Sequence, residues 1–495
     1  MRVGLGFLTW PLCVALAAVL VSCGSASQDV IGIAAIGEAD DPFEKGIRLS
    51  PTGQMIRAAT AEGLVSFDAQ GRIVPALADR WIVTDDGRSY IFRLRDGTWR
   101  DGSPLTSRSA LRALRNAVAS LKGTSLGIDL SPIEDIRDMA GRVIEVRLVR
   151  PMPHFLQLMA QPELGLFYKN AGAGPMQLDK EDGTAILTPI EPSELGLPKV
   201  QDWDRKIRTI RLESMEGGQA VKRFNQGEAD IVLGGTILEF PYTRSVGILR
   251  GTIQLDSVTG LFGLIVTHTD GFLSEAANRE ALAMAIDREA LITPFGLAGW
   301  EPTTRLVPSG LDGDTGTIEE RWKDRDIEGR RTQAAGRVKS WRNSQNDDGK
   351  PIELRIRLPE GPGANLFFKR IAGDFARIGI QSRQVGPDEV ADLKLIDDVA
   401  RYPRAQWFLN RLNCKVQAGP CSRKADELVE QANRSDNEVD HARLLAEAEV
   451  EMTLANIFIP IGAPVRWSLV RGDVAEFSKN RLGWHPLMPL GMPPK

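Results

Sequence analysis

The segment Pro75–Gly102 constrains the fold more than any other stretch of the chain, because two apolar strands and several turn signals lie within it. The predicted strands Trp81–Thr84 and Ser89–Arg95 flank Asp85-Asp86-Gly87, a sequence typical of a β-hairpin turn. Side chains alternate along a strand, so every second residue of the second strand shares one face. These residues are Tyr90, Phe92 and Leu94. The segment therefore predicts a hairpin with one apolar face.

A helix is predicted directly after the hairpin, beginning near Ser107. Its apolar residues repeat with the period of an α-helix. They are Leu111, Leu114, Val118 and Leu121. Further along, Gly260–Thr267 is a continuous apolar strand, and Ala277–Ile292 has helical periodicity. Because strands and helices alternate along the chain, we predict an α/β fold with parallel strands.

The first 23 residues have the pattern of an export signal rather than of a folded element. Arg2 supplies a positive charge, and Val3–Val21 is apolar and uncharged. The segment closes on Ser22-Cys23, which resembles a bacterial lipobox. We predict a lipoprotein signal peptide over residues 1–22, with Cys23 as the lipidated residue. A plain signal anchor of the same length is the alternative, and the choice of membrane stays open.

Charge and hydropathy narrow the class of protein further. The sequence has 61 Lys+Arg and 65 Asp+Glu, which gives a net charge of −4, and these charges are well mixed. Nucleic-acid binding is not expected from such a balance. After the signal, no stretch approaches the ~20 uncharged apolar residues that a membrane helix needs. The mature protein is therefore expected to attach to the membrane only through the lipid on Cys23.

Two cysteines remain once Cys13 leaves with the signal peptide and Cys23 carries the lipid. Cys414 and Cys421 are close in sequence, and a disulfide between them is expected in an oxidising periplasm. Two free thiols, or half of a metal site, are the alternatives. The sequence contains four histidines, far apart from one another. We predict no metal site and no cofactor.

Three segments resemble the family 5 extracellular solute-binding proteins, the dipeptide- and oligopeptide-binding receptors of ABC importers. They are the hairpin segment Pro75–Gly102, the segment REALAMAIDREALI at residues 279–292, and the segment around Cys414 and Cys421. The resemblance extends from about residue 29 to the C-terminus. It implies a periplasmic-binding-protein-like two-lobe fold, of type II in its three-domain variant, with a hinged ligand cleft.

The resemblance also implies a division into domains. The first lobe is expected to consist of residues 23–50, 171–267 and 462–495. Residues 51–170 are expected to form an inserted domain, and residues 268–461 the second lobe.

The sequence departs from the family pattern at the segment that contacts ligand. In peptide-binding members, an aspartate of the third domain holds the α-amino group of the peptide. Arg401 occupies the position of that aspartate here. A guanidinium would repel an ammonium group, but it suits a carboxylate or phosphate. We predict a solute with an anionic group or without a free amine at this end. The alternative is that Arg401 faces solvent or pairs with Asp397 or Asp398.

Other ligand-binding candidates follow from the resemblance. Asp398, Tyr402 and Trp407 lie in the same segment as Arg401, although both aromatic residues could belong to the core. Thr267 and His268 end a buried strand at the expected lobe crossing, and Trp300 lies in a loop expected to face the hinge. A loop role without ligand contact is the alternative for His268 and for Trp300.

One sequence pattern could indicate an enzyme. Residues 123–127, Gly-Thr-Ser-Leu-Gly, fit the G-x-S-x-G nucleophile elbow of α/β-hydrolases, with Ser125 as nucleophile. That elbow requires a strand before the serine, whereas a helix is predicted here. A helix that ends at Gly123 explains the glycine better. We therefore predict no catalytic residue.

The combined expectation is a lipid-anchored periplasmic receptor of an ABC importer that captures a peptide-like or other small solute. The resemblance implies permease subunits and their ATPases, on other chains, as partners of a monomer. A secreted serine hydrolase using Ser125 and a non-transporting envelope scaffold are the alternatives. The identity of the solute stays open.

Overall fold

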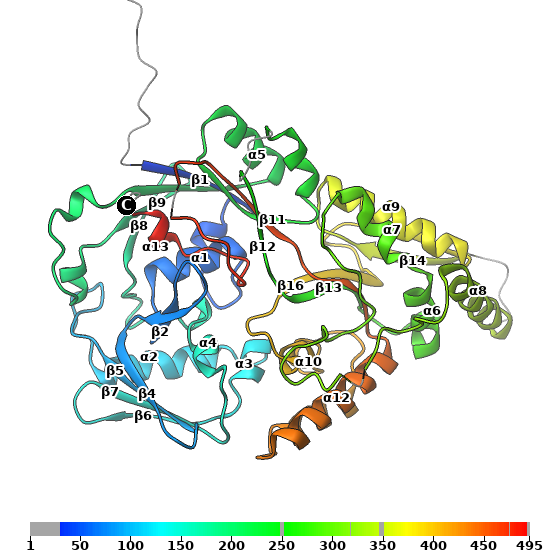
Figure 1. Cartoon of the computed structure of the whole chain (residues 1–495), viewed down its shortest axis with the longest axis horizontal. Helices are drawn as coiled ribbons and strands as arrows, with labels where there is room; N and C mark the ends of the chain where they lie inside the picture. Colours follow the sequence, from blue (N-terminus) through cyan, green and yellow to red (C-terminus); the bar gives the residue numbers. More distant parts are fainter. Residues whose placement is uncertain (1–29, 248–251, 317, 346–350, 475, 493–495) are drawn as a thin grey trace, which may run out of the picture.

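The computed structural model describes residues 30–247, 252–316, 318–345, 351–474 and 476–492. The predicted signal peptide and Cys23 lie outside these residues. Figure 1 shows two α/β lobes that lie next to one another and are joined near the centre of the molecule. An additional domain, inserted in the first lobe, lies below its sheet in this view. The predicted two-lobe fold is therefore confirmed.

A seven-stranded sheet forms the core of the first lobe. Its order is β12 (Ile253–Asp256), β18 (Arg466–Val470), β11 (Ile231–Thr236), β1 (Val30–Ile36), β10 (Thr209–Met215), β9 (Thr184–Pro189) and β8 (Met176–Glu181). β1 pairs in parallel with β10 and β11. Ile31 and Ile33 of β1 pack in one apolar cluster and Ala34 in another, so this central strand is buried on both faces of the sheet.

The inserted domain contains a four-stranded antiparallel sheet and confirms the predicted hairpin. Its order is β4 (Ala78–Val83), β5 (Ser89–Leu94), β7 (Val143–Leu148) and β6 (Ile133–Met139). Val83 pairs with Tyr90 across the hairpin, and the predicted apolar face of β5 is buried. Helix α2 (Ser107–Ser120) begins where predicted, because Thr106 and Ser109 form a capping box at its N-terminus.

A five-stranded sheet forms the core of the second lobe. Its order is β15 (Ile380–Val385), β14 (Ile352–Arg357), β16 (Leu393–Val399), β13 (Gly260–Val266) and β17 (Phe458–Gly462). β13 pairs with β16 and β17, so it belongs to this sheet and not to the first lobe, where the domain prediction placed it. All residues of β13 are buried, and a strand of this kind has the same continuous apolar sequence in either sheet. The sequence therefore does not show to which lobe the strand belongs.

The predicted helix at residues 277–292 is two helices. α6 (Ala276–Ala285) ends before Ile286, and α7 (Arg288–Ile292) begins after Asp287. The Asp287 carboxylate accepts a hydrogen bond from the Ala290 backbone N–H at 3.0 Å. This N-cap begins a new helix and interrupts the periodic pattern.

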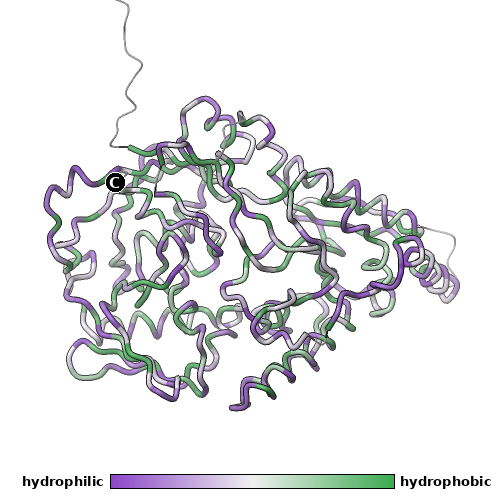
Figure 2. Tube along the Cα trace, viewed as in Figure 1, coloured by the Kyte–Doolittle hydropathy of each residue, from purple (hydrophilic) through white to green (hydrophobic). Residues whose placement is uncertain are grey.

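The remaining longer helices are α1 (Pro51–Thr60), α5 (Gly217–Gln226), α8 (Ile327–Ser344), α9 (Pro362–Arg377), α11 (Arg423–Ala432) and α12 (Glu438–Ala455). Cys414 and Cys421 lie between α10 (Ala405–Arg411) and α11 and form the predicted disulfide, with their Cα atoms 5.2 Å apart. Figure 2 shows apolar residues concentrated along the strands of both lobes and polar residues along the outer helices.

Candidate functional site

Two chain crossings join the lobes and mark the hinge. Residues 257–259 connect β12 of the first sheet to β13 of the second, and residues 463–465 connect β17 back to β18. An ion pair spans the second crossing, because Arg466 Nη1 of β18 lies 2.7 Å from Asp397 Oδ1 of β16. Burial raises the pKa of Asp397, although the charge of Arg466 opposes this shift. The two lobes are therefore linked by a buried ion pair beside the hinge.

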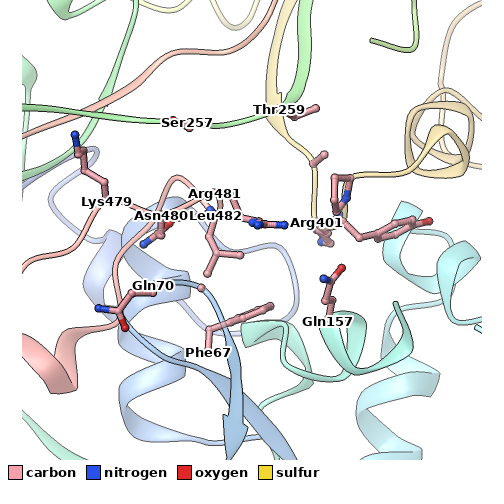
Figure 3. A pocket seen from close by; sticks show the side chains of 14 residues that line it. Phe67, Gln70, Gln157, Ser257, Thr259, Arg401, Lys479, Asn480, Arg481 and Leu482 are labelled. Carbon is pink, nitrogen blue, oxygen red and sulfur yellow. Dashed lines mark hydrogen bonds between the residues drawn. The ribbon is translucent and has the colours of Figure 1, made fainter. Parts of the chain in front are cut away.

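A cavity of about 370 Å³ lies where the lobes meet this hinge. Figure 3 shows side chains from both lobes and from the inserted domain around it. The lining residues are Phe67, Gln70, Gly71, Gln157, Ser257, Thr259, Ala400, Arg401, Tyr402, Pro403, Lys479, Asn480, Arg481 and Leu482. Among them are three cationic side chains and no carboxylate. The size is within the range of pockets that hold small organic ligands.

A tight turn near the C-terminus supplies two of the cations. The side-chain oxygen of buried Asn480 accepts hydrogen bonds from the backbone N–H groups of Leu482 at 2.8 Å and Gly483 at 3.2 Å. The neighbours Lys479 and Arg481 are exposed, and neither forms an ion pair within the described residues. The buried Asn480 side chain therefore stabilises the turn, and the charges of Lys479 and Arg481 on either side of it are not compensated within the described part of the chain.

Arg401 lies in the loop between β16 and α10 and contacts the inserted domain. Its Nη2 lies 2.9 Å from Glu163 Oε1, and its Nη1 lies 3.3 Å from Ser125 Oγ. The Glu163 side chain is 5% exposed and that of Arg401 is 24% exposed. Burial alone would lower the pKa of Arg401, but the charge of Glu163 reverses the shift and the pKa is raised. Arg401 lines the cavity as a paired cation.

Arg401 forms an ion pair with neither Asp397 nor Asp398, the two alternative partners. Asp397 pairs with Arg466, and Asp398 Oδ2 accepts a hydrogen bond from Arg411 Nε at 2.6 Å. Asp398, predicted as a ligand-binding residue, therefore contacts an arginine of α10 and is not part of the cavity lining.

Tyr402 lines the cavity and is also bonded to the inserted domain. Its hydroxyl donates to Asp129 Oδ1 at 2.6 Å, and Asn410 Nδ2 donates to the same oxygen at 2.7 Å. The Tyr402 ring stacks on His154, with the ring centroids 4.1 Å apart. Burial lowers the pKa of His154 to about 3, so this ring is neutral at pH 7. Tyr402 and Arg401 together fasten the second lobe to the inserted domain.

Asp129 is expected to make the stability of this contact depend on pH. Burial raises the pKa of Asp129 to about 6, although hydrogen bonds from Tyr402 and Asn410 oppose the shift. The unfolded chain releases this proton near pH 4. The contribution of Asp129 is therefore fully present below about pH 4 and is lost as the pH rises through about 6.

We expect Asp129→Asn, which keeps a neutral group there, to remove this dependence. Between pH 4 and 6 the difference in unfolding free energy from the wild type should change by about 1.4 kcal/mol per pH unit. Urea titrations at several pH values measure this difference. Asp138→Asn, at an exposed position of β6, is the control. Parallel profiles for Asp129→Asn and the wild type would contradict the assignment.

Two predicted site residues lie far from the cavity. Thr267 and His268 follow the end of β13, whereas the lobe crossing is at the beginning of that strand, so they lie roughly 20 Å away along it. The Thr267 hydroxyl donates to the carbonyl oxygen of Ala391, and His268 Nε2 lies 2.7 Å from Asp392 Oδ1. The expected position at the crossing is thus corrected, because β13 belongs to the sheet of the second lobe and the crossing therefore precedes this strand instead of following it.

The two predicted tryptophans also stay outside the cavity lining. Trp300 Nε1 donates to the carbonyl oxygen of Ala463 at 2.8 Å, and its ring would collide with any side chain at Gly462. Trp300 therefore supports the second crossing. Trp407 is 1% exposed and packs edge-to-face on Phe408, within the core. Of the seven predicted ligand-binding residues, the structure brings Arg401 and Tyr402 to the cavity.

Several lining residues were not predicted. Phe67 ends β2 (Val65–Phe67), Gln70 lies in the turn before β3 (Ile73–Pro75), and Gln157 lies on α4 (Phe155–Met159). No sequence pattern marks these residues. The triplet Lys479-Asn480-Arg481 offered a signal, because two cations flank an amide side chain in a segment that continues into Leu482-Gly483-Trp484.

Ser125 does not occupy a nucleophile elbow. It is the first residue of the short helix α3 (Ser125–Asp129), and helix α2 precedes it where an elbow requires a strand. Its hydroxyl oxygen accepts a hydrogen bond from Arg401. We expect the wild type and Ser125→Ala to hydrolyse a nitrophenyl ester no faster than buffer does. Faster hydrolysis by the wild type that Ser125→Ala abolishes would contradict this.

Within the described residues, no group of three or more histidine, cysteine, aspartate or glutamate side chains is arranged to hold a metal ion. In the same part of the chain, no helix combines the length and apolar character that crossing a bilayer requires.

Comparisons with known proteins agree on one family. A sequence profile of the bacterial extracellular solute-binding proteins, family 5 middle region, matches residues 72–381. The probable deoxycholate-binding periplasmic protein YgiS of Escherichia coli is 34% identical over 129 residues, which are 21% of this chain and 23% of that protein. The oligopeptide-binding protein OppA of Bacillus subtilis is 23% identical over 321 residues, 56% of each chain. The chain thus spans 23% and 56% of the lengths of these two relatives.

The fold is shared with solved structures. The murein tripeptide binding protein MppA of Escherichia coli superposes with a TM-score of 0.79 at 18% identity, over 94% of this chain and 99% of that one. At this identity the likeness shows the fold, including the two lobes.

Proposed function

The chain belongs to the bacterial extracellular solute-binding proteins of family 5, and from this membership we propose that it captures a small solute between its lobes. Captured solute would pass to the permease of an ABC importer, whose subunits and ATPases are other chains. The chain itself would perform no catalysis. The observation that carries this proposal is the cavity of about 370 Å³ at the hinge.

The position of the cavity supports capture by closure. Its lining comes from the first lobe, the inserted domain and the second lobe, so a rotation at the two crossings would open it. A solute in contact with all three parts favours the closed arrangement, because it binds that arrangement better than the open one.

The charge of the cavity supports a solute with an anionic group. Arg401, Lys479 and Arg481 are the charged lining residues, and all three are cations. One relative is named as a probable deoxycholate-binding protein, and deoxycholate carries a carboxylate. Another is named as oligopeptide-binding, and peptides also end in a carboxylate. We propose that such a group lies near Arg401.

We further propose that Cys23 carries a lipid that anchors the protein in the periplasm, to the cell membrane or the outer membrane. The lipobox-like Leu20-Val21-Ser22-Cys23 supports this anchor. Mass spectrometry of the protein from a membrane fraction tests it, since a diacylglyceryl group on Cys23 would be expected.

Small-angle X-ray scattering tests capture of a solute. The protein as purified is compared with protein stripped in guanidinium chloride and refolded, its disulfide kept intact. We expect the stripped protein to have the larger radius of gyration, and the small molecules released by stripping to restore the compact form. Identical scattering curves, with no small molecule released, would contradict the proposed function.

A further inference from the structure

We propose that the captured solute is an organic anion with an apolar body and no ammonium group, bridged between Arg481 of the first lobe and Arg401 of the second. This inference rests on the proposed function and specifies the solute class. Figure 3 shows the Arg481 side chain extending toward Arg401 across the cavity. Two guanidinium groups from opposite lobes repel one another, and an anion between them reverses that repulsion into attraction.

The two arginines contribute unequally. Arg401 is already compensated by Glu163 at 2.9 Å, whereas Arg481 has no ion-pair partner within the described residues. Arg481 therefore supplies the uncompensated charge. Arg401 is held in place by Glu163 and Ser125, and its guanidinium has further N–H groups to donate to the same anion. A carboxylate is the anion that matches this fork geometry on an organic solute.

Among the described residues that line the cavity there is no carboxylate to bind an ammonium group. The carboxylates next to the lining or the crossings are each bonded to another side chain. These pairs include Glu163 with Arg401, Asp129 with Tyr402, Asp397 with Arg466, Asp398 with Arg411, Asp68 with Arg72 and Asp256 with His485. An ammonium group would be desolvated beside cations and without a counter-charge, which is strongly unfavourable. A zwitterionic peptide is therefore a poor fit to this cavity.

Apolar side chains lie beside the cationic ones. Phe67 of β2 and Leu482 near the C-terminus both line the cavity, and both are labelled in Figure 3. Phe67 is fixed from behind by an edge-to-face contact with Trp484, at 6.2 Å between ring centroids. Ala400 and Pro403, from the loop of the second lobe that contains Arg401, add apolar groups to the lining. This arrangement accommodates an apolar body whose carboxylate reaches the arginines.

The remaining polar lining is neutral. Gln70, Gln157, Ser257 and Thr259 present amide and hydroxyl groups. Such groups can hydrogen-bond to hydroxyl or carbonyl groups of a solute, and none of them balances a positive charge. The charged lining residues therefore favour a solute with a negative charge.

Four forms of the dipeptide Ala-Phe test this inference by calorimetry: the free dipeptide, its N-acetyl derivative, its C-terminal amide, and the derivative blocked at both ends. These probes share one apolar body and differ only in their terminal charges. We expect the N-acetyl acid to bind best, at least about tenfold tighter than the free dipeptide and the doubly blocked form. The C-terminal amide, which is cationic, should bind worst.

The same titrations with Arg481→Ala complete the test. The advantage of the N-acetyl acid over the doubly blocked form should fall at least about fivefold, because the carboxylate loses its uncompensated partner. Equal or tighter binding of the free dipeptide would overturn the inference and leave the receptor function intact. Absence of binding by all four probes would also overturn it, whereas the receptor function is decided separately by the scattering of stripped and reloaded protein.

Discussion

Replacing Arg401 by alanine is expected to lower the free energy of unfolding by about 3 kcal/mol at pH 7. The substitution leaves Glu163, 5% exposed, without its cationic partner, and Glu163 Oε2 has no hydrogen-bond partner among the described residues. Breaking a buried ion pair costs about 3–5 kcal/mol. The lower end applies because the Arg401 side chain is 24% exposed. Urea titration followed by circular dichroism measures the difference.

The matched control removes both partners. Arg401→Ala combined with Glu163→Gln should recover part of the loss, because no buried charge then remains unpaired. Arg108→Ala, at an exposed position of α2, removes a positive charge elsewhere and should change stability by less than about 0.5 kcal/mol. A loss for Arg401→Ala no greater than that of Arg108→Ala would show that the ion pair with Glu163 does not fasten the lobes.

Replacing Arg481 by alanine is expected to weaken binding of an organic anion about 30-fold while leaving stability nearly unchanged. Arg481 is exposed and unpaired within the described residues, so its removal leaves no buried group without a partner. A charge-assisted hydrogen bond contributes about 1.5–3 kcal/mol, and about 2 kcal/mol corresponds to 30-fold. Titration calorimetry with the N-acetyl dipeptide measures this loss.

Two comparisons make the result specific. Arg108→Ala removes one positive charge, as Arg481→Ala does, but lies outside the cavity, so the affinity should stay within about twofold of the wild type. Arg481→Lys keeps the charge without the fork and should recover only part of the affinity. Equal losses for Arg481→Ala and Arg108→Ala would show that the effect arises from net charge rather than from a contact in the cavity.

The two substitutions distinguish the roles of two arginines that line one cavity. Arg401, paired with Glu163, is expected to govern stability more than affinity. Arg481, without a partner in the described part of the chain, is expected to govern affinity more than stability. The departure from the family pattern at Arg401 is thus accompanied by a second basic residue some eighty positions later, at the same cavity.

Local patterns predicted much of the fold. The turn Asp85-Asp86-Gly87 placed the hairpin, and the structure pairs Val83 with Tyr90 across it. Helix α2 begins at Ser107 as predicted, because its N-cap is encoded by neighbouring residues. The disulfide between Cys414 and Cys421 spans a short separation and was also predictable. Each of these features depends on residues close together in the sequence.

The site was less predictable because it depends on distant residues. Arg401 and Glu163 are separated by 238 residues, so no local pattern connects them. Thr267 and His268 were predicted at the lobe crossing, but β13 belongs to the second lobe, so the crossing lies before Gly260. Residue types alone do not show which of the two sheets this buried strand joins. Arg481 was overlooked because exposed arginines are common, and only its position beside the hinge gives it significance.

Native mass spectrometry of the protein as purified shows directly whether the bound solute is an organic anion that depends on Arg481. We expect a co-purified organic acid that does not react with amine-selective reagents. It should be present on the wild type and on Arg108→Ala, and lost from Arg481→Ala. A co-purified peptide with a free α-amino group, bound equally by the wild type and Arg481→Ala, would show that the solute is not an organic anion held by Arg481.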